Sequence, residues 1–335
     1  MNKKYMNIIL VFSCLLLLCN CKNKTSTEIS LNQELKAVTF DFTELPGIGL
    51  EKGITRRDPS DIIYIDRVYY IYYTKVIGQA SGYWGDMWYA TSTDGFIWEE
   101  KSRILGIGKT GDFDSQAVFT PNIMEVKGKY YLFYTGVKPT PGRNDGIFEN
   151  NASTDITAIG LAIADNPYGP FTRLTEDPVL EISESSEKFD SYRIDDAALL
   201  FKDDNYMLYY KGRSRSHGTR GPAHTQMGVA ISYKPEGPYI KYGSPLLDKS
   251  HEVLIWKHGE GVAALASISS TLAYSKTGLD FTSDGKNIKV DNRPFAPGAY
   301  RPDLTGGKAK KLEWGISMVH NGPDCYLIRY DVIEK

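Results

Sequence analysis

The sequence predicts an all-β fold, and more specifically a five-bladed β-propeller. Short apolar strands alternate with turns rich in Gly, Pro, Asp and Asn, and no sustained helical periodicity follows the N-terminal leader. A phrase also recurs along the chain: a short apolar strand with a carboxylate or amide just upstream, a polar turn, and then a Tyr-rich strand. A second family of segments, each a strand, a Gly or Pro turn and an aromatic edge strand, would complete four-stranded blades.

The recurring phrase has three clear copies with nearly constant spacing. They lie at residues 57–64 leading to 69–74, at 119–123 leading to 130–135, and at 195–200 leading to 206–210. Similarity at fixed spacing indicates a repeated supersecondary unit. In a radial β-repeat the start of each innermost strand faces one central funnel, so one polar side chain per blade would converge there.

The repeats divide the chain into blades. We expect blade one at about residues 58–104, blade two at 118–174, blade three at 196–242 and blade four from about His251 onward. Blade five would use residues 314–317 and 326–329, and the early segment 37–42 would join it and close the ring. Closure removes exposed edge strands. The C-terminal copies are degenerate, so four or six blades stay open.

Composition excludes several classes of protein. The 335 residues carry a formal net charge of -2, whereas a nucleic-acid-binding protein would need a net basic face. Three of the four cysteines lie in the leader, which leaves Cys325 alone in the rest of the chain. We therefore expect no internal disulfide, no thiolate metal site and no cofactor, and a bound structural cation stays open.

The first 21 residues are typical of a secretory leader. Lys3 and Lys4 precede an apolar run at residues 8–18, which is too short for a stable membrane span. The end of this segment resembles a bacterial lipoprotein processing site with Cys21 as the lipidated residue. We expect residues 22–36 to be a polar tether, residues 37–335 to form the propeller, and the protein to be lipid-anchored in a bacterial cell envelope, either periplasmic or on the outer-membrane surface.

Carboxylates at the starts of three repeats are the candidate catalytic residues. Asp58 precedes Pro59, which holds its neighbour extended at the mouth end of the first inner strand. Asp195 and Asp196 start the third unit, and because neighbouring strand residues point to opposite faces, only one can enter the funnel; register favours Asp196. His251 and Glu252 start the fourth unit, and either could donate a proton near neutral pH.

Other side chains are candidates for binding substrate. In the second unit Asn122 takes the position that matches Asp58, and its amide would contact hydroxyl groups. Aromatic rings could stack on sugar faces, and a Gly-rich basic loop after Tyr210 could hold an anionic or hydroxylated group. The residues expected in these two roles are Trp84, Trp88, Trp256, Arg213 and His224.

Three acidic positions on separate blades fit glycoside hydrolysis. An inverting enzyme needs a base that activates water and an acid on the other side of the glycosidic bond, several ångströms away. Opposite blades across a funnel supply that separation. The expected partner is therefore an oligosaccharide substrate.

The chain resembles a known family, glycoside hydrolase family 117. The resemblance rests on Arg57-Asp58-Pro59-Ser60-Asp61, on residues 87–95 and 118–121, and on His251-Glu252-Val253-Leu254-Ile255-Trp256 followed by residues 261–265. It covers roughly residues 55–265. The resemblance implies a five-bladed propeller, related in architecture to the family 43 arabinosidases and xylosidases.

The resemblance also implies an activity. Members of family 117 release 3,6-anhydro-L-galactose from the non-reducing end of neoagaro-oligosaccharides by an exo-acting, inverting mechanism. Carried over by motif, Asp58 would be the general base, Asp196 would position substrate or tune a pKa, and either His251 or Glu252 would be the acid. Members carry a helical N-terminal arm exchanged within a dimer, and residues 23–53 show no long helix here, so any dimer would form by another route.

Two alternatives remain open from the sequence. One is a family 43-like α-L-arabinofuranosidase or β-xylosidase. The other is a carbohydrate-binding lipoprotein that kept the funnel without the chemistry.

Overall fold

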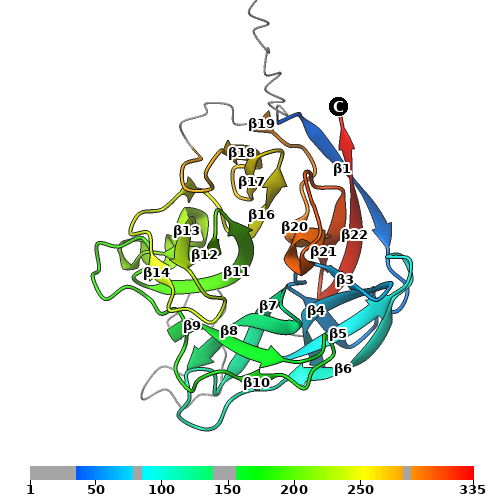
Figure 1. Ribbon diagram of the computed structural model, residues 1–335, viewed down its shortest axis with the longest axis horizontal. Coiled ribbons are helices and arrows are strands. Elements are labelled where there is room, and N and C mark those ends of the chain that lie inside the picture. The colour runs from blue at the N-terminus through cyan, green and yellow to red at the C-terminus, as the bar shows by residue number, and fades with distance from the viewer. Residues whose placement is uncertain (1–34, 78–84, 139–155, 282–287) are drawn as a thin grey trace, which may run out of the picture. The chain divides into compact units, whose positions relative to one another are not determined.

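Five small antiparallel sheets form a ring around a central axis (Figure 1). The computed structural model describes residues 35–335 except 78–84, 139–155 and 282–287. The leader, the lipidation candidate Cys21 and the candidate Trp84 lie outside the described residues. The predicted all-β, five-bladed propeller is confirmed.

Blades one and two each begin with a strand at the axis and continue outward. Blade one comprises β2 (Ile54–Arg57), β4 (Val68–Ile77), β5 (Asp86–Ser92) and β6 (Glu99–Leu105), with β3 (Ile63–Ile65) also paired to β4. Blade two comprises β7 (Ala117–Val126), β8 (Lys129–Lys138), β9 (Ile156–Ala164) and β10 (Thr172–Arg173).

Blades three and four follow the same order. Blade three comprises β11 (Arg193–Lys202), β12 (Asn205–Arg213), β13 (Gln226–Ser232) and β14 (Ile240–Lys241), with β15 (Leu247–Asp248) paired to β13 and the 3-10 helix η1 (Arg215–His224) after β12. Blade four comprises β16 (Val253–His258), β17 (Gly261–Ala266), β18 (Thr271–Ser275) and β19 (Ile288–Lys289).

Blade five joins the two ends of the chain. It comprises β20 (Phe295–Ala299), β21 (Trp314–Asn321), β22 (Asp324–Glu334) and β1 (Val38–Glu44), with the 3-10 helix η2 (Pro302–Thr305) after β20. Strand β1 pairs antiparallel with β22 from Val38–Glu334 to Glu44–Ile328. The predicted closure of the ring by the early strand is confirmed.

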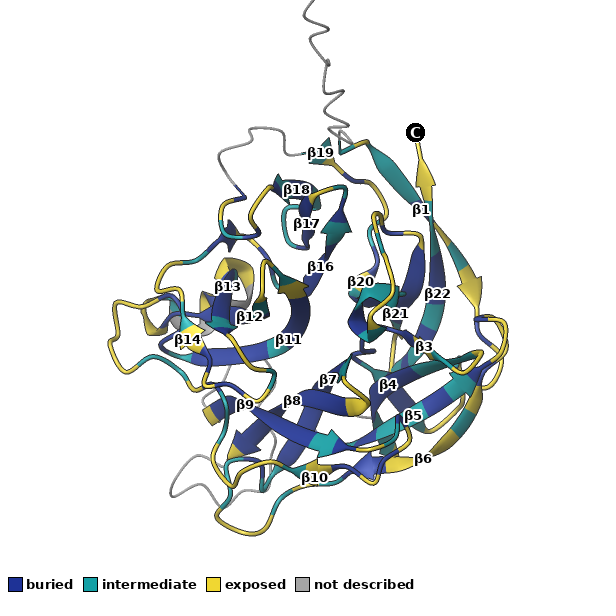
Figure 2. Ribbon diagram, viewed as in Figure 1, coloured by how far each residue is buried: buried dark blue, intermediate teal, exposed yellow. Residues whose placement is uncertain are grey.

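The core fills the spaces between neighbouring blades. Inner and middle strands such as β8 and β11 are largely buried, and outer strands such as β6 are mostly exposed (Figure 2). Cys325, the single cysteine among the described residues, is buried in β22 and has a free thiol. Within the described residues no helix is long and apolar enough to cross a membrane.

A hydrogen-bonded hub ties the five blades together at the axis. Asp61 of blade one accepts from the Ala299 backbone N–H of blade five at 2.8 Å. Arg301 donates to the carbonyl oxygens of Leu199 in blade three, at 3.1 Å, and Ile255 in blade four. Asn122 of blade two donates to the Ala197 carbonyl of blade three at 2.9 Å. Buried polar groups are satisfied here by partners from other blades, which fixes the register of the ring.

Candidate active site

A single pocket at the end of the axis collects two consecutive residues from every blade. We call it the mouth, and its lining residues are Asp58 and Pro59, Thr120 and Pro121, Asp196 and Ala197, Glu252 and Val253, and Ala296 and Pro297. Three carboxylates from three different blades therefore meet in one place, as a radial repeat allows.

Four of these blades present the mouth residue through the same backbone irregularity. Asp58, Thr120, Asp196 and Ala296 all have positive φ, at 50°, 47°, 54° and 39°. Register shifts interrupt the ladders of β7, β11 and β20 at these points. Such a bulge re-aims a side chain from the strand face toward the opening. A left-handed conformation is tolerated by Asp but strained for Thr and Ala, and strain of this kind gathers at functional sites.

The bulge corrects one prediction about blade two. Thr120 stands at the position equivalent to Asp58, so the predicted match of Asn122 was two residues out of register. Asn122 instead lies buried below the mouth, where its side chain contacts Asp61 and Ala197 in the hub. Its amide is engaged with protein partners, which leaves the substrate-binding role predicted for Asn122 without support.

Asp58 is held by the residue that precedes it. The Arg57 Nε donates to Asp58 Oδ2 at 2.8 Å. The carboxylate is mostly buried, with 7% of its side chain exposed. An acceptor fixed in this way at the wall of a pocket can receive a proton from a water molecule bound in the mouth.

Asp196 shares a cation with its neighbour Asp195. Lys211 Nζ lies 3.0 Å from a carboxylate oxygen of each. Burial, together with the charges of Asp195 and Asp58, raises the pKa of Asp196 to about 7 although Lys211 opposes the shift. Asp195 is buried behind the mouth. Burial alone would raise its pKa, but the charges of Lys211, Arg193 and Arg213 outweigh this effect and hold the pKa below its usual range.

Glu252 is the acidic residue that blade four contributes to the mouth. Its backbone N–H donates to Ser267 Oγ at 2.9 Å, and Arg293 Nη1 lies 3.5 Å from Glu252 Oε2. His251 also donates its backbone N–H to Ser267 Oγ, while its ring lies 3.5 Å from Thr225 Oγ1. Of the two, Glu252 lines the mouth.

The sequence does not mark several groups that line the mouth or act on the carboxylates there. Thr120, Arg293 and Lys211 have no unusual sequence context, although Thr120-Pro121 repeats the pairing of Asp58 with Pro59. His320, at the end of β21, is a further case: burial and Arg57 lower its pKa, and the charges of Asp58 and Glu252 act in the opposite direction. No local pattern marks His320, because it reaches this region from the second strand of its blade.

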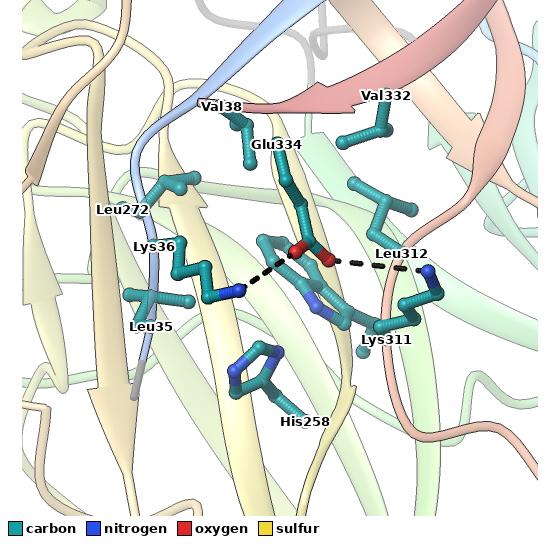
Figure 3. Close-up of a pocket in the computed structure, with 10 residues that line it drawn as sticks. Leu35, Lys36, Val38, His258, Leu272, Lys311, Leu312, Val332 and Glu334 are labelled. Carbon is teal, nitrogen blue, oxygen red and sulfur yellow. Dashed lines mark hydrogen bonds and ion pairs between the residues drawn. The ribbon is translucent and has the colours of Figure 1, made fainter. Parts of the chain in front are cut away.

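The aromatic candidates lie elsewhere. Trp88 belongs to β5, where Lys75 Nζ sits 4.1 Å from its ring centroid, and it does not line the mouth. Trp256 is buried in β16 and lines a different groove, between blade four and the β1–β22 pair. In that groove Lys36 and Lys311 both reach Glu334 (Figure 3). Neither Trp88 nor Trp256 lines the mouth, which leaves the stacking role predicted for them without support there.

The basic candidates divide between interior and surface. Arg213 is buried at the end of β12 and acts on Asp195 from behind the mouth rather than from a loop. His224 is exposed in η1, and its ring stacks on that of His217 with 4.6 Å between centroids. Among the described residues no group of three or more His, Cys, Asp or Glu side chains is arranged to hold a metal ion.

Comparisons with known proteins place this geometry among sugar-cleaving enzymes. The family model of glycosyl hydrolases family 43 matches residues 54–198, which span blades one and two and the start of blade three. The structure of Zg3597, a family 117 glycoside hydrolase of the marine bacterium Zobellia galactanivorans, is similar with a TM-score of 0.73 and 26% identity. The match covers 88% of this chain and 90% of that one. No curated protein sequence matches the chain.

More distant structures share the fold. An endo-arabinase of Bacteroides thetaiotaomicron is 15% identical with a TM-score of 0.54, covering 87% of this chain and 99% of that one. A family 43 enzyme of Xanthomonas citri in complex with xylose is 15% identical with a TM-score of 0.55, covering 84% and 88%. The chain is therefore a glycoside hydrolase on a five-bladed propeller that resembles family 117 and shares its architecture with family 43.

Proposed function

We propose that the chain is an exo-acting, inverting glycoside hydrolase that releases 3,6-anhydro-L-galactose from the non-reducing end of neoagaro-oligosaccharides. The observation that carries the proposal is the convergence of Asp58, Asp196 and Glu252, from three blades, on one pocket. The likeness to a family 117 enzyme over 88% of the chain supports the choice of substrate.

The proposed mechanism uses one water molecule and two proton transfers. Asp58 takes a proton from water as the water oxygen bonds to the anomeric carbon, and Glu252 gives a proton to the departing glycosidic oxygen. The glycosidic bond breaks and the anomeric configuration inverts. Glu252 takes the acid role here rather than His251 because Glu252 lines the mouth. Asp196, between them along the chain, positions substrate.

Product analysis tests the proposal. Purified protein lacking residues 1–21 is incubated with neoagarobiose and neoagarotetraose, and products are followed by NMR from the first minutes. Release of 3,6-anhydro-L-galactose from the non-reducing end, with the inverted anomer appearing first, is the expected result. Formation of the retained anomer would contradict inversion, and absence of any release would contradict the substrate.

A family 43-like activity is the second candidate, because the family 43 pattern covers residues 54–198. An α-L-arabinofuranosidase or β-xylosidase would cleave aryl-arabinosides or aryl-xylosides. Turnover of either compound, without turnover of neoagarobiose, would replace the first candidate by the second. Binding of oligosaccharide with no turnover of any of these compounds would favour the binding-only lipoprotein.

The leader supports a cellular location. We propose that Cys21 is lipidated and anchors the enzyme in a bacterial envelope, on the periplasmic or outer-membrane surface, late in polysaccharide breakdown. Metabolic labelling of full-length protein with radioactive palmitate is expected to mark the wild type and not Cys21→Ser. Equal labelling of both would contradict this anchor.

A further inference from the structure

The strongest unassigned feature is a buried cluster directly behind the mouth. Lys211 Nζ lies 3.0 Å from Asp195 Oδ1 and 3.0 Å from Asp196 Oδ2, so one ammonium is shared by two adjacent carboxylates. The Lys211 side chain is 7% exposed, and that of Asp195 is 1% exposed. A lysine this deeply buried is uncommon unless it is paired, and here Lys211 is paired with two carboxylates.

Strand register explains why one lysine reaches both carboxylates. Asp195 pairs with Lys211 across the β11–β12 ladder, and the bulge that follows turns Asp196 into the mouth. The φ of 54° at Asp196 breaks the alternation that would otherwise send the two side chains to opposite faces. Both carboxylates can therefore approach the same ammonium.

The rear of the cluster fixes where the lysine can go. Arg193 Nε donates to Asp195 Oδ2 at 3.2 Å, while Lys211 lies at the other oxygen, Oδ1. Arg193 therefore fixes one oxygen of Asp195, and the other oxygen of Asp195 holds Lys211. Because Asp195 is held by the interior, the ammonium stays at a fixed distance from the mouth.

We propose that Lys211 is a positioning residue that holds the Asp196 carboxylate in the mouth and favours its ionised form, with Asp195 as the anchor of the lysine. The role rests on the proposed function for its catalytic meaning, since Asp196 positions substrate there. Lys211 itself does not line the mouth. No sequence motif assigns it.

The charges that face Asp196 come from several elements. Lys211 of β12 favours its ionised form, whereas Asp195 of β11 and Asp58 of blade one oppose it. Glu252 and His251 precede β16, which packs against β11, and blade two contributes Thr120, which does not titrate. Arg301 and Asp303 form a buried ion pair at η2, in which the Arg301 Nε donates to Asp303 Oδ1 at 2.8 Å. Among the described residues, Lys211 is the cation that pairs with Asp196. Its removal leaves the like charges of Asp195 and Asp58 unopposed, so the pKa of Asp196 should rise.

The experiment reads the titration of Asp196 without any substrate. The full protein is labelled with carbon-13 at the aspartate carboxyl groups, the Asp196 signal is assigned by its loss in Asp196→Asn, and its chemical shift is followed with pH. In Lys211→Met the midpoint is expected to rise by about one pH unit or more, and in Asp195→Asn to fall, because opposite charges are removed. Lys211→Arg, which keeps the charge, is expected to stay within about half a unit.

Opposite shifts separate this role from a purely structural one. An unmoved midpoint in Lys211→Met, or shifts of the same sign in Lys211→Met and Asp195→Asn, would overturn the proposal. Should Lys211→Met fail to fold, Lys211→Gln, which also removes the charge, takes its place: a midpoint that rises supports the proposal, and one that stays or falls contradicts it. Because the titration needs no turnover, the shifts can appear even if every tested sugar is left intact, which would count against the proposed function only.

Discussion

Every carboxylate at the mouth has a cation beside it. Asp58 is paired with Arg57, Asp196 with Lys211, and Glu252 with Arg293. The three cations differ in origin. Arg57 is the sequence neighbour of Asp58, Lys211 is shared with a second carboxylate, and Arg293 comes from the segment just before β20 of blade five. Different surroundings give chemically identical groups different roles, which is how one pocket can hold both a base and an acid.

The acid role of Glu252 predicts a dependence on the leaving group. Glu252→Gln keeps an acceptor for Arg293 but cannot donate a proton. We expect kcat on an unactivated oligosaccharide to fall by about 10²–10⁴-fold, and kcat on an aryl glycoside with a good leaving group to fall far less, because such a group departs without protonation.

The matched control is Asp58→Asn, in which loss of the base should slow both substrates alike. Steady-state kinetics on the two substrates measure the ratio. Equal losses on both substrates in Glu252→Gln would remove Glu252 from the acid role and direct attention to His251 and His320.

At the scale of the element, the sequence predicts the strands that have strong β propensity and misses one that lacks it. The Tyr-rich strands β4, β8 and β12 carry strong β propensity and fall where expected. Strand β20 (Phe295–Ala299) escapes prediction because Pro297 and Gly298 are poor strand residues. Its Ala296-Pro297 pair nevertheless matches Thr120-Pro121 at the mouth, and this would have been the one signal for it.

The candidate site, like the strands, is predictable from the sequence only in part. Asp58, Asp196 and Glu252 reach the mouth, as their positions at strand starts suggest. Asn122 does not line the mouth because a bulge in β7 shifts the strand register, and the spacing of apolar residues in the sequence does not reveal a bulge. Trp88 and Trp256 do not line the mouth, and the sequence could not show this because an aromatic residue in a strand fits a blade interface as well as a sugar platform.

The closing strand β1 makes a prediction of its own. Phe40 is buried, and its ring meets that of Tyr330 edge-on with centroids 5.7 Å apart. Phe40→Ala is expected to reduce the free energy of unfolding by about 3–5 kcal/mol, because a large cavity forms where the two ends of the chain pair.

Urea denaturation monitored by fluorescence measures this loss. Thr43→Ala is the control: Thr43 lies in the same strand but is exposed, so its change should stay below about 1 kcal/mol. A Phe40→Ala variant as stable as Thr43→Ala would show that β1 contributes little to ring closure.

At the scale of the whole molecule, one arginine links distant parts of the ring. Arg301 is almost fully buried and contacts Asp61, Leu199, Ile255 and Asp303, which belong to blades one, three and four and to η2. Its charge is compensated by Asp61 at 3.4 Å and Asp303 at 2.8 Å. The hub lies below the mouth and sets the distance between blades that carry catalytic residues.

Loss of this arginine should therefore destabilise the whole ring. Arg301→Met leaves Asp61 buried without its cation and Asp303 with Lys257 at 3.9 Å, and we expect a loss of about 3–5 kcal/mol in the free energy of unfolding. Lys311→Met, which removes an exposed cation at the groove of Glu334, is the control and should change stability by less than about 1 kcal/mol. Similar stability of the two variants in urea would contradict the role of the hub.

The central claim is that the mouth is a hydrolytic site in which Asp58 is the base, and Asp58→Asn tests it most directly. The measurement combines kcat on the oligosaccharide that the wild type cleaves with calorimetric affinity for the same compound. We predict a fall in kcat of at least about 10²-fold with the dissociation constant unchanged within a few-fold, because the amide keeps the shape but cannot accept the proton. Retained turnover, or loss of binding in step with turnover, would contradict the account.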